Sequence, residues 1–174
     1  MANRRAIFLD RDGTLMEEVH YCNDPARVRA FPGVAGALAR FRHAGWLVIV
    51  ITNQSGLATG KITPAQYEAV HAELMRQVHS QLDAVYFCAD HPQAPTERRK
   101  PGSGMLFEAA AEHGIDLSKS WMIGDKDVDV ACGRGAGCRT MLVRTGYGAG
   151  QGDTGADFVV DDVVAASDLI LAVR

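Results

Sequence analysis

The sequence predicts a doubly wound α/β fold, in which a mostly parallel sheet is covered by helices on both faces. Short apolar runs alternate along the chain with longer stretches whose apolar residues recur at helical spacing. This alternation implies right-handed crossovers between parallel strands. The 174 residues suffice for one hydrophobic core and contain no linker, repeat or low-complexity tract, so a single domain over residues 1–174 is expected.

The chain is expected to begin with a strand, a helix and a second strand. Residues 6–9 and 46–51 are continuous apolar runs, as in strands buried on both faces. Between them, Val34 and Phe41 lie at helical spacing after a Pro-Gly turn. Gly45 is expected to end that helix in a left-handed conformation.

The next helix is expected to run from Thr63 to about Gln81. Thr63 can act as the N-cap, Pro64 suits the first helical position, and Gln66 closes a capping box. Further along, the same patterns predict strands at 84–88, 121–123, 140–143 and 158–160, and helices at 105–113, 128–136 and 163–172. Three long polar loops, 13–30, 55–62 and 89–104, follow predicted strands, where folds of this class bind ligands.

Composition excludes several classes of partner. A net charge of -3 and a pI near 6.0 give no basic field for nucleic acid, and no stretch approaches the roughly 20 apolar residues that span a membrane. The few residues before Asp10 cannot hold the apolar region of a secretory signal, so a cytoplasmic location is expected. The four cysteines are scattered without a paired spacing, which suits reduced thiols better than disulfides. No apolar surface stripe stands out as a dimer interface, so a monomer is expected.

Two carboxylates, Asp10 and Asp12, follow the first predicted strand directly. Extended geometry points both the same way, at the sheet edge where ligands bind. We interpret Asp10 as a nucleophile and Asp12 as a general acid and then base. Gly13 lets the backbone turn sharply. Taken alone, the segment could also be an ordinary Asp-Gly turn with solvated acids.

Phosphate ligands are expected from two further segments. Residues 52–56, at the end of the second strand, supply backbone donors and the Thr52 hydroxyl for a phosphoryl oxygen. In the basic run 98–100, Lys100 could neutralise the transferred phosphate and Arg99 could grip a second anionic group with its bidentate fork. The alternatives are a capped loop and a solvated basic loop.

An acid cluster follows the strand predicted at 121–123. Asp125, Asp10 and the backbone carbonyl of Asp12 could complete the octahedral oxygen shell that Mg²⁺ requires. Asp129, one helical turn further on, could orient this shell or pair with Lys100.

These motifs, DRDGT at 10–14, TNQSG at 52–56, Lys100 and GDKDVD at 124–129, resemble in this order the haloacid dehalogenase (HAD) superfamily of aspartate-nucleophile phosphatases. The resemblance covers nearly the whole chain and implies a Rossmann-like fold with a minimal cap made of loops. It also implies an aspartyl-phosphate intermediate and a Mg²⁺ cofactor. The implied catalytic residues are Asp10, Asp12, Thr52 and Lys100, and the implied metal ligands are Asp10, Asp12 and Asp125.

Within the superfamily, the sequences DRDGT, TNQSG and RKPGSGM resemble the subfamily of heptose-bisphosphate and histidinol phosphatases. The implied substrate is a small phosphorylated metabolite, first a heptose 1,7-bisphosphate losing its C7 phosphate, with histidinol phosphate as the alternative. Arg99 matches the position that recognises the phosphate left behind. The implied substrate-binding residues are Asp10, Asp12, Glu18, Val19, His20, Tyr21, Thr52, Asn53, Gln54, Ser55, Arg99, Lys100 and Lys126.

The chain departs from the subfamily pattern at one place. Many members carry a zinc site in the loop before the lysine that corresponds to Lys100. The matching stretch begins Cys88-Ala89-Asp90-His91 and contains no further cysteine before Lys100. Four tetrahedral ligands cannot be assembled from it, so no structural zinc is expected and the loop should be held by turns and salt links.

The non-enzymatic alternative is a phospho-receiver signalling domain, which is also doubly wound. A receiver keeps its phosphorylated aspartate at a later strand, whereas this acid pair follows the first strand. The position of the pair therefore favours a hydrolase.

Overall fold

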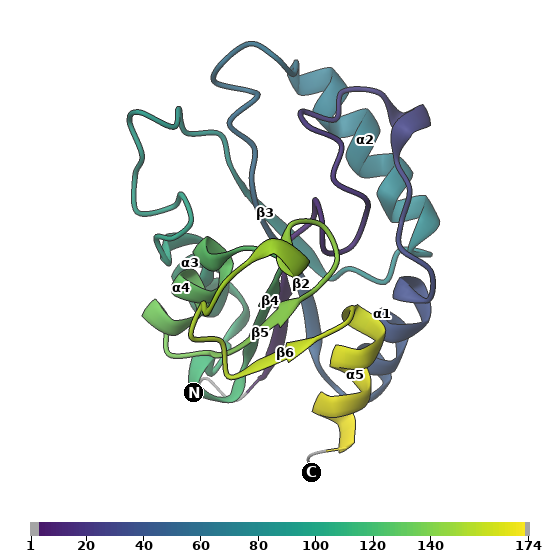
Figure 1. The fold of residues 1–174 in the computed structure, drawn as a ribbon, viewed down its shortest axis with the longest axis vertical. Coiled ribbons are helices and arrows are strands. Elements are labelled where there is room, and N and C mark those ends of the chain that lie inside the picture. The colour runs from purple at the N-terminus through teal and green to yellow at the C-terminus, as the bar shows by residue number, and fades with distance from the viewer. Residues whose placement is uncertain (1–3, 173–174) are drawn as a thin grey trace.

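A computed structural model describes residues 4–172 and shows a six-stranded, wholly parallel sheet (Figure 1). The strand order is β3-β2-β1-β4-β5-β6. The strands are β1 (Ala6–Leu9), β2 (Leu47–Asn53), β3 (Ala84–Cys88), β4 (Trp121–Gly124), β5 (Arg139–Val143) and β6 (Phe158–Val160). Residues 1–3, which are part of the stretch used to argue against a secretory signal, lie outside the described residues.

Helices cover both faces of the sheet, as predicted for a doubly wound fold. They are α1 (Val34–His43), α2 (Pro64–Gln77), α3 (Gly104–His113), α4 (Asp127–Gly135) and α5 (Val163–Ala172), with short 3-10 helices at Pro25–Arg27, Leu117–Lys119 and Gly148–Gly150. Alternating residues of β1 face opposite sides. Ile7 and Leu9 share a core with α1, α2 and α5, whereas Phe8 packs in a second core with α3 and α4.

The predicted α2 cap is confirmed, but the predicted end of that helix is wrong. The Thr63 hydroxyl accepts from the Gln66 amide, and the Gln66 side chain accepts from the Thr63 amide. The helix ends at Gln77 instead of about Gln81. His79 and Ser80 adopt left-handed conformations, with φ of 52° and 55°, which no α-helix can contain.

The order of the strands reverses between β1 and β4. The chain passes from β1 to β2 on one side and from β4 to β5 on the other, which opens a crevice at the carboxyl ends of β1 and β4. In the described part of the chain, the segments that follow β1 and β2 at this crevice, and the segment before α3, are mainly loops, which agrees with the expected minimal cap. None of the described helices is long and apolar enough to span a membrane.

Candidate active site

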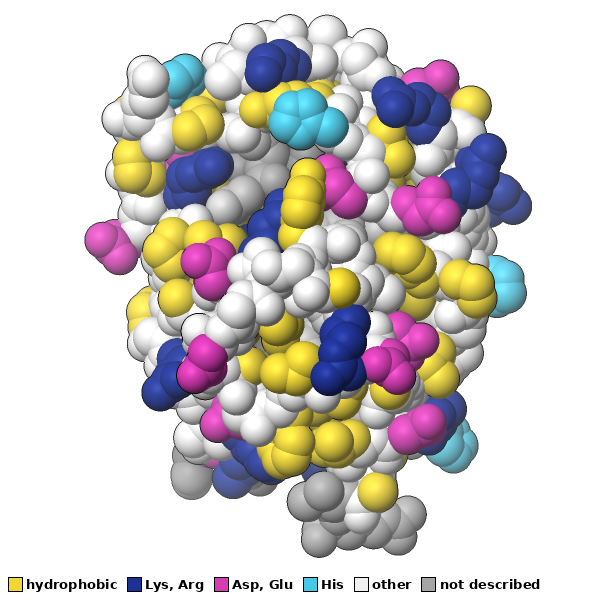
Figure 2. Space-filling model, viewed as in Figure 1, with side chains coloured by type: hydrophobic (Ala, Val, Ile, Leu, Met, Phe, Trp, Pro, Cys, Tyr) yellow, Lys and Arg dark blue, Asp and Glu magenta, His cyan; other side chains and the backbone are white. Residues whose placement is uncertain are grey.

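A cavity of about 270 Å³ lies at this crevice and collects most of the predicted site residues. Figure 2 shows the molecule hollowed in its upper half, with basic, acidic and histidine side chains around the hollow. Twelve of the lining residues belong to the predicted set: Asp10, Asp12, Glu18, His20, Tyr21, Thr52, Asn53, Gln54, Ser55, Arg99, Lys100 and Lys126. Val19 does not line the cavity; it packs against the hydrophobic core.

Asp10 lies at the floor of the cavity, where the backbone is fixed by both central strands. Its amide donates to the carbonyl of Ile123 in β4 at 3.0 Å, and its side chain is almost fully buried. Burial raises the pKa of Asp10, although the nearby charge of Lys100 opposes the shift. The chain bends at Arg11, so the acid pair is not extended as predicted, yet Asp10 and Asp12 line the same cavity.

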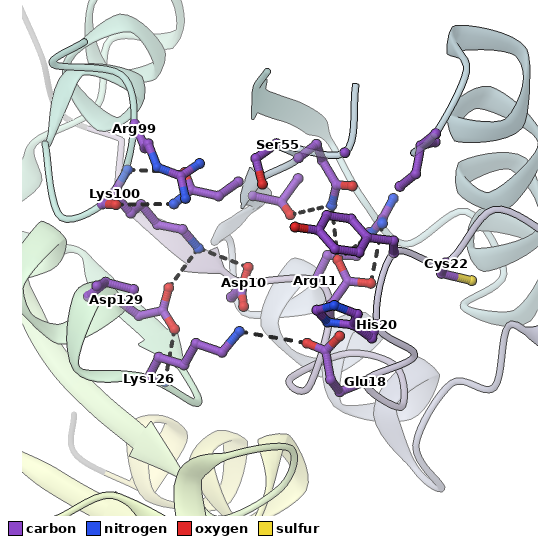
Figure 3. A pocket seen from close by; sticks show the side chains of 18 residues that line it. Asp10, Arg11, Glu18, His20, Cys22, Ser55, Arg99, Lys100, Lys126 and Asp129 are labelled. Carbon is purple, nitrogen blue, oxygen red and sulfur yellow. Dashed lines mark hydrogen bonds and ion pairs between the residues drawn. The ribbon is translucent and has the colours of Figure 1, made fainter. Parts of the chain in front are cut away.

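Lys100 links Asp10, which follows β1, to Asp129 in the first turn of α4 (Figure 3). Its Nζ donates to Asp10 Oδ1 at 2.8 Å, to Asp129 Oδ1 at 2.6 Å and to the Ile51 carbonyl at 2.8 Å. Burial alone would lower the pKa of Lys100, but the charges of Asp10 and Asp129 outweigh it and raise that pKa. Lys100 is therefore a buried cation that stays charged.

Asp125 offers an oxygen that fits a hard cation. Its side chain is buried; Oδ2 accepts from the Tyr147 amide at 2.9 Å, whereas Oδ1 has no partner among the described residues. Burial and then the charge of Asp10 raise the pKa of Asp125 to about 7. A buried carboxylate with an unused oxygen beside another carboxylate is the donor set that Mg²⁺ takes.

Asp129 lies in the same acidic cluster as Asp10 and Asp125, but its oxygens are already used. Oδ1 accepts from Lys100 Nζ, and Oδ2 accepts from the Lys126 amide at 3.0 Å. Of the two roles that the sequence left open for Asp129, the structure shows the pairing with Lys100.

Close packing leaves no room for side chains around Asp125. Gly13 has φ of +85°, and Gly146 has φ of +55°, both in the left-handed region. A Cβ at either position would collide with Asp125 Oδ2. The sharp turn predicted at Gly13 is thus confirmed. The sequence did not reveal that Gly13 also leaves room for the Asp125 side chain.

The last residue of β2 and the first residue of the loop after it hold their neighbours through side-chain hydrogen bonds. Gln54 Nε2 donates to Asp12 Oδ2 and to Thr52 Oγ1, both at 2.9 Å. The Asn53 side chain makes two hydrogen bonds of 3.1 Å with the backbone of Lys100, one as donor and one as acceptor. Asn53 and Gln54 were predicted as substrate ligands, and their contacts with Lys100 and Asp12 were not foreseen.

The mouth of the cavity is charged. Lys126 Nζ lies 3.7 Å from Glu18 Oε2 across it (Figure 3), and burial followed by the charge of Asp12 raises the pKa of Glu18. Arg99 lines the same mouth and forms no ion pair within residues 4–172. The Arg99 guanidinium, beside a lysine, donates a long hydrogen bond of 3.5 Å to the Asp90 carbonyl and suits a second anionic group.

Sequence reasoning missed Arg11, which lines the cavity and is 1% exposed. Its Nε and Nη2 donate to the two oxygens of Asp12 at 2.9 and 3.2 Å. The sequence did contain an indication of this burial. An arginine that directly follows an apolar strand, between two acids, is more easily paired with a neighbouring carboxylate than exposed to solvent.

Comparison with known proteins defines the class. The HAD-hydrolase-like family model matches residues 97–166. A crystal structure of D,D-heptose 1,7-bisphosphate phosphatase from B. bronchiseptica, in complex with magnesium and phosphate, superposes with a TM-score of 0.90 at 32% identity, covering 98% of this chain and 99% of that one. The fold and the site together define a phosphatase of the HAD hydrolases.

Similar proteins of known name identify the family within the HAD hydrolases. The chain is 38% identical to D-glycero-D-manno-heptose-1,7-bisphosphate 7-phosphatase of Thermosynechococcus vestitus, covering 96% of this chain and 95% of the relative. It is 35% identical to the D-glycero-beta-D-manno-heptose-1,7-bisphosphate 7-phosphatase of Escherichia coli K12, covering 97% and 93%. The chain belongs to the family of D-glycero-D-manno-heptose 1,7-bisphosphate 7-phosphatases.

Proposed function

We propose that this enzyme removes the C7 phosphate from D-glycero-D-manno-heptose 1,7-bisphosphate through an aspartyl-phosphate on Asp10. The observation that carries the proposal is the buried Asp10, which is held by Lys100 and lies in one cluster with Asp125, whose Oδ1 has no partner among the described residues. A nucleophile between a fixed cation and a cation-binding oxygen suits attack on a phosphate ester, where charge must be neutralised.

In the first half-reaction, a carboxylate oxygen of Asp10 attacks phosphorus and the bond to the sugar oxygen breaks. Asp12 gives a proton to that oxygen, so the sugar leaves as an alcohol. In the second half-reaction, Asp12 takes a proton from water, whose oxygen attacks the acyl phosphate and releases inorganic phosphate. Asp10 and Asp12 then have their initial protonation states.

Mg²⁺, when bound, would neutralise charge on the phosphoryl oxygens, and Asp10, Asp125 and the carbonyl of Asp12 would hold it. Lys100 fixes Asp10 and supplies positive charge for the transferred phosphoryl group. The Thr52 hydroxyl and the backbone amide of Ser55 bind its remaining oxygens, whereas the Gln54 amide donates to the Cys88 carbonyl at 2.7 Å.

Residues at the mouth recognise the rest of the substrate. Arg99 binds the phosphate that stays on the sugar, because it is the cation at the mouth without a described ion-pair partner. Glu18, His20 and Lys126, with Tyr21 and Ser55, line the space available to the sugar hydroxyls. We further propose that the enzyme works as a cytoplasmic monomer in the synthesis of lipopolysaccharide heptose precursors, without a structural zinc.

The test is phosphate release in the presence of Mg²⁺ from heptose 1,7-bisphosphate, fructose 1,6-bisphosphate and histidinol phosphate. We expect the highest kcat/KM on the heptose bisphosphate. Asp10→Asn should abolish release while circular dichroism stays unchanged. Preference for histidinol phosphate would assign the enzyme to histidine synthesis, and retained activity of Asp10→Asn would refute the nucleophile.

A further inference from the structure

Arg11 is the most deeply buried arginine described in the structure and stands between the two acids of the DRDGT motif. Burying a guanidinium is costly unless it is paired with good geometry. Its pairing is bidentate: Nε and Nη2 donate to Oδ2 and Oδ1 of Asp12. The buried guanidinium of Arg11 therefore forms its ion pair with Asp12, the proposed general acid and base, and not with Asp10, the proposed nucleophile.

The guanidinium of Arg11 also packs against an aromatic ring of α2. Its Cζ lies 5.5 Å from the centre of the Tyr67 ring, within reach of a cation-π interaction, and the Tyr67 ring is nearly buried. The third nitrogen, Nη1, is buried without a partner among the described residues. Two fixed hydrogen bonds and one aromatic face hold Arg11 in a single orientation.

Asp12 is constrained from a third direction by Gln54, whose Nε2 donates to Asp12 Oδ2 at 2.9 Å. In each of these hydrogen bonds, an N–H group of Arg11 or Gln54 donates to the Asp12 carboxylate. They fix where the carboxylate lies relative to Asp10, and a misplaced proton donor costs rate because proton transfer requires hydrogen-bond distance to the leaving oxygen.

We propose that Arg11 is a positioning residue that aims Asp12 at the leaving oxygen, with Tyr67 holding Arg11 in place. This inference rests on the proposed function, in which Asp12 protonates the departing sugar oxygen. Arg11 transfers no proton and forms no bond to the substrate; its effect passes through Asp12 alone.

The inference predicts an effect that depends on the leaving group. A sugar alkoxide must receive a proton as its bond to phosphorus breaks, whereas 4-nitrophenolate departs without one. The parameter kcat/KM reports the steps up to the release of the first product, so it isolates this proton transfer. A merely structural role would lower kcat/KM for both substrates together.

The experiment compares Arg11→Lys, which keeps the charge but loses the planar fork, with wild type on heptose 1,7-bisphosphate and on 4-nitrophenyl phosphate. We expect kcat/KM on the sugar phosphate to fall by about 10- to 100-fold and on the aryl phosphate by less than about threefold. Asp12→Asn should show the same selectivity, with a larger loss. Tyr67→Leu should show a smaller selective loss, which Tyr67→Phe should not.

The matched control is Arg139→Lys, an exposed arginine that also stacks on an aromatic ring, that of Trp121 at 4.1 Å, but at the opposite end of the sheet. It should leave both activities unchanged. Equal losses on the two substrates in Arg11→Lys, or no loss on either, would overturn the role of Arg11. Absence of turnover by the wild-type enzyme would instead overturn the proposed function, and aryl phosphate turnover by Arg11→Lys shows that the variant is folded.

Discussion

Lys100 is a buried cation whose removal should affect the stability of the protein. Its ammonium is buried between Asp10 and Asp129, with side-chain exposures of 2%, 9% and 1% respectively. Lys100→Met would leave two buried carboxylates without their cation. We expect a loss of about 3 kcal/mol in the free energy of unfolding, measured by urea in EDTA at neutral pH.

Asp129→Asn is the companion variant, because it leaves the pair between Lys100 and Asp10 in place. It should cost less stability than Lys100→Met. A Lys100→Met protein as stable as wild type would mean that the two carboxylates are neutral in the folded state, contrary to the charged cluster inferred here.

Gly13 is the residue whose replacement should damage the site most locally. Gly13→Ala would place a Cβ against Asp125 in a left-handed conformation, so we expect a loss of about 1–2 kcal/mol or more and nearly complete loss of activity. Gly36→Ala is the control, since Gly36 lies in α1 with open space around it. That change should stabilise the protein by about 0.5–1 kcal/mol with unchanged turnover. Thermal unfolding and phosphate release measure both effects.

Individual site residues could be predicted where their chemistry depends on strand ends. Asp10, Thr52 and Asp125 follow buried strands, and parallel strands bring their carboxyl ends together. The partners of a side chain could not be predicted, because they depend on loop paths. This is why Asp129 kept two possible roles and why Val19, adjacent to cavity-lining residues, turned out to face the core.

At the scale of elements, the loop between β3 and α3 is held by side-chain hydrogen bonds. Asp90 Oδ2 accepts from the Thr96 amide at 2.7 Å and from the Thr96 hydroxyl at 2.6 Å, and Arg98 forms an ion pair with Glu108 of α3 at 3.0 Å. Hydrogen bonds from Thr96 lower the pKa of Asp90. The turns and salt links expected for this loop are confirmed, whereas the expected absence of zinc stays a prediction.

Asp90→Ala should loosen this loop and therefore the position of Arg99. We expect KM for the heptose bisphosphate to rise about 3- to 10-fold with little change in kcat, because Lys100 keeps its own contacts. Steady-state kinetics test this, with His91→Ala in the same loop as the control. A zinc-selective chelator that lowers the melting temperature in excess Mg²⁺ would contradict a loop held without metal.

The secondary structure was predictable wherever a periodic apolar pattern or a cap was present. All strands and α-helices lie where the sequence indicates, and α5 has the predicted bounds. The 3-10 helices were missed, since three residues carry no period. The end of α2 was misplaced because Val78 and Leu82 are buried and continue the apolar stripe after the helix has stopped.

At the scale of the whole molecule, stability should depend on pH through the acidic cluster. The folded pKa of Asp125, about 7, lies above its ordinary value of 3.8, so the metal-free folded protein holds a proton that the unfolded chain releases. The free energy of unfolding in EDTA should therefore fall as pH rises from about 5 to about 7.

Mg²⁺ should reverse this trend, because it binds the deprotonated carboxylates. The difference in melting temperature between Mg²⁺ and EDTA should grow across the same pH range. Asp125→Asn should remove both the slope and the metal effect. If wild type and Asp125→Asn respond equally to Mg²⁺ across this range, Asp125 does not bind the metal.

The pair of hydrogen bonds between the Asn53 side chain and the Lys100 backbone has an evolutionary consequence. A carboxamide copies the donor and acceptor of a peptide group, so the tip of β2 recognises one residue of a distant loop as it would recognise a neighbouring strand. Residues between β3 and that point can be inserted, deleted or replaced while the lysine keeps its place. The rim that meets the sugar can thus diversify among relatives without rebuilding the reaction centre.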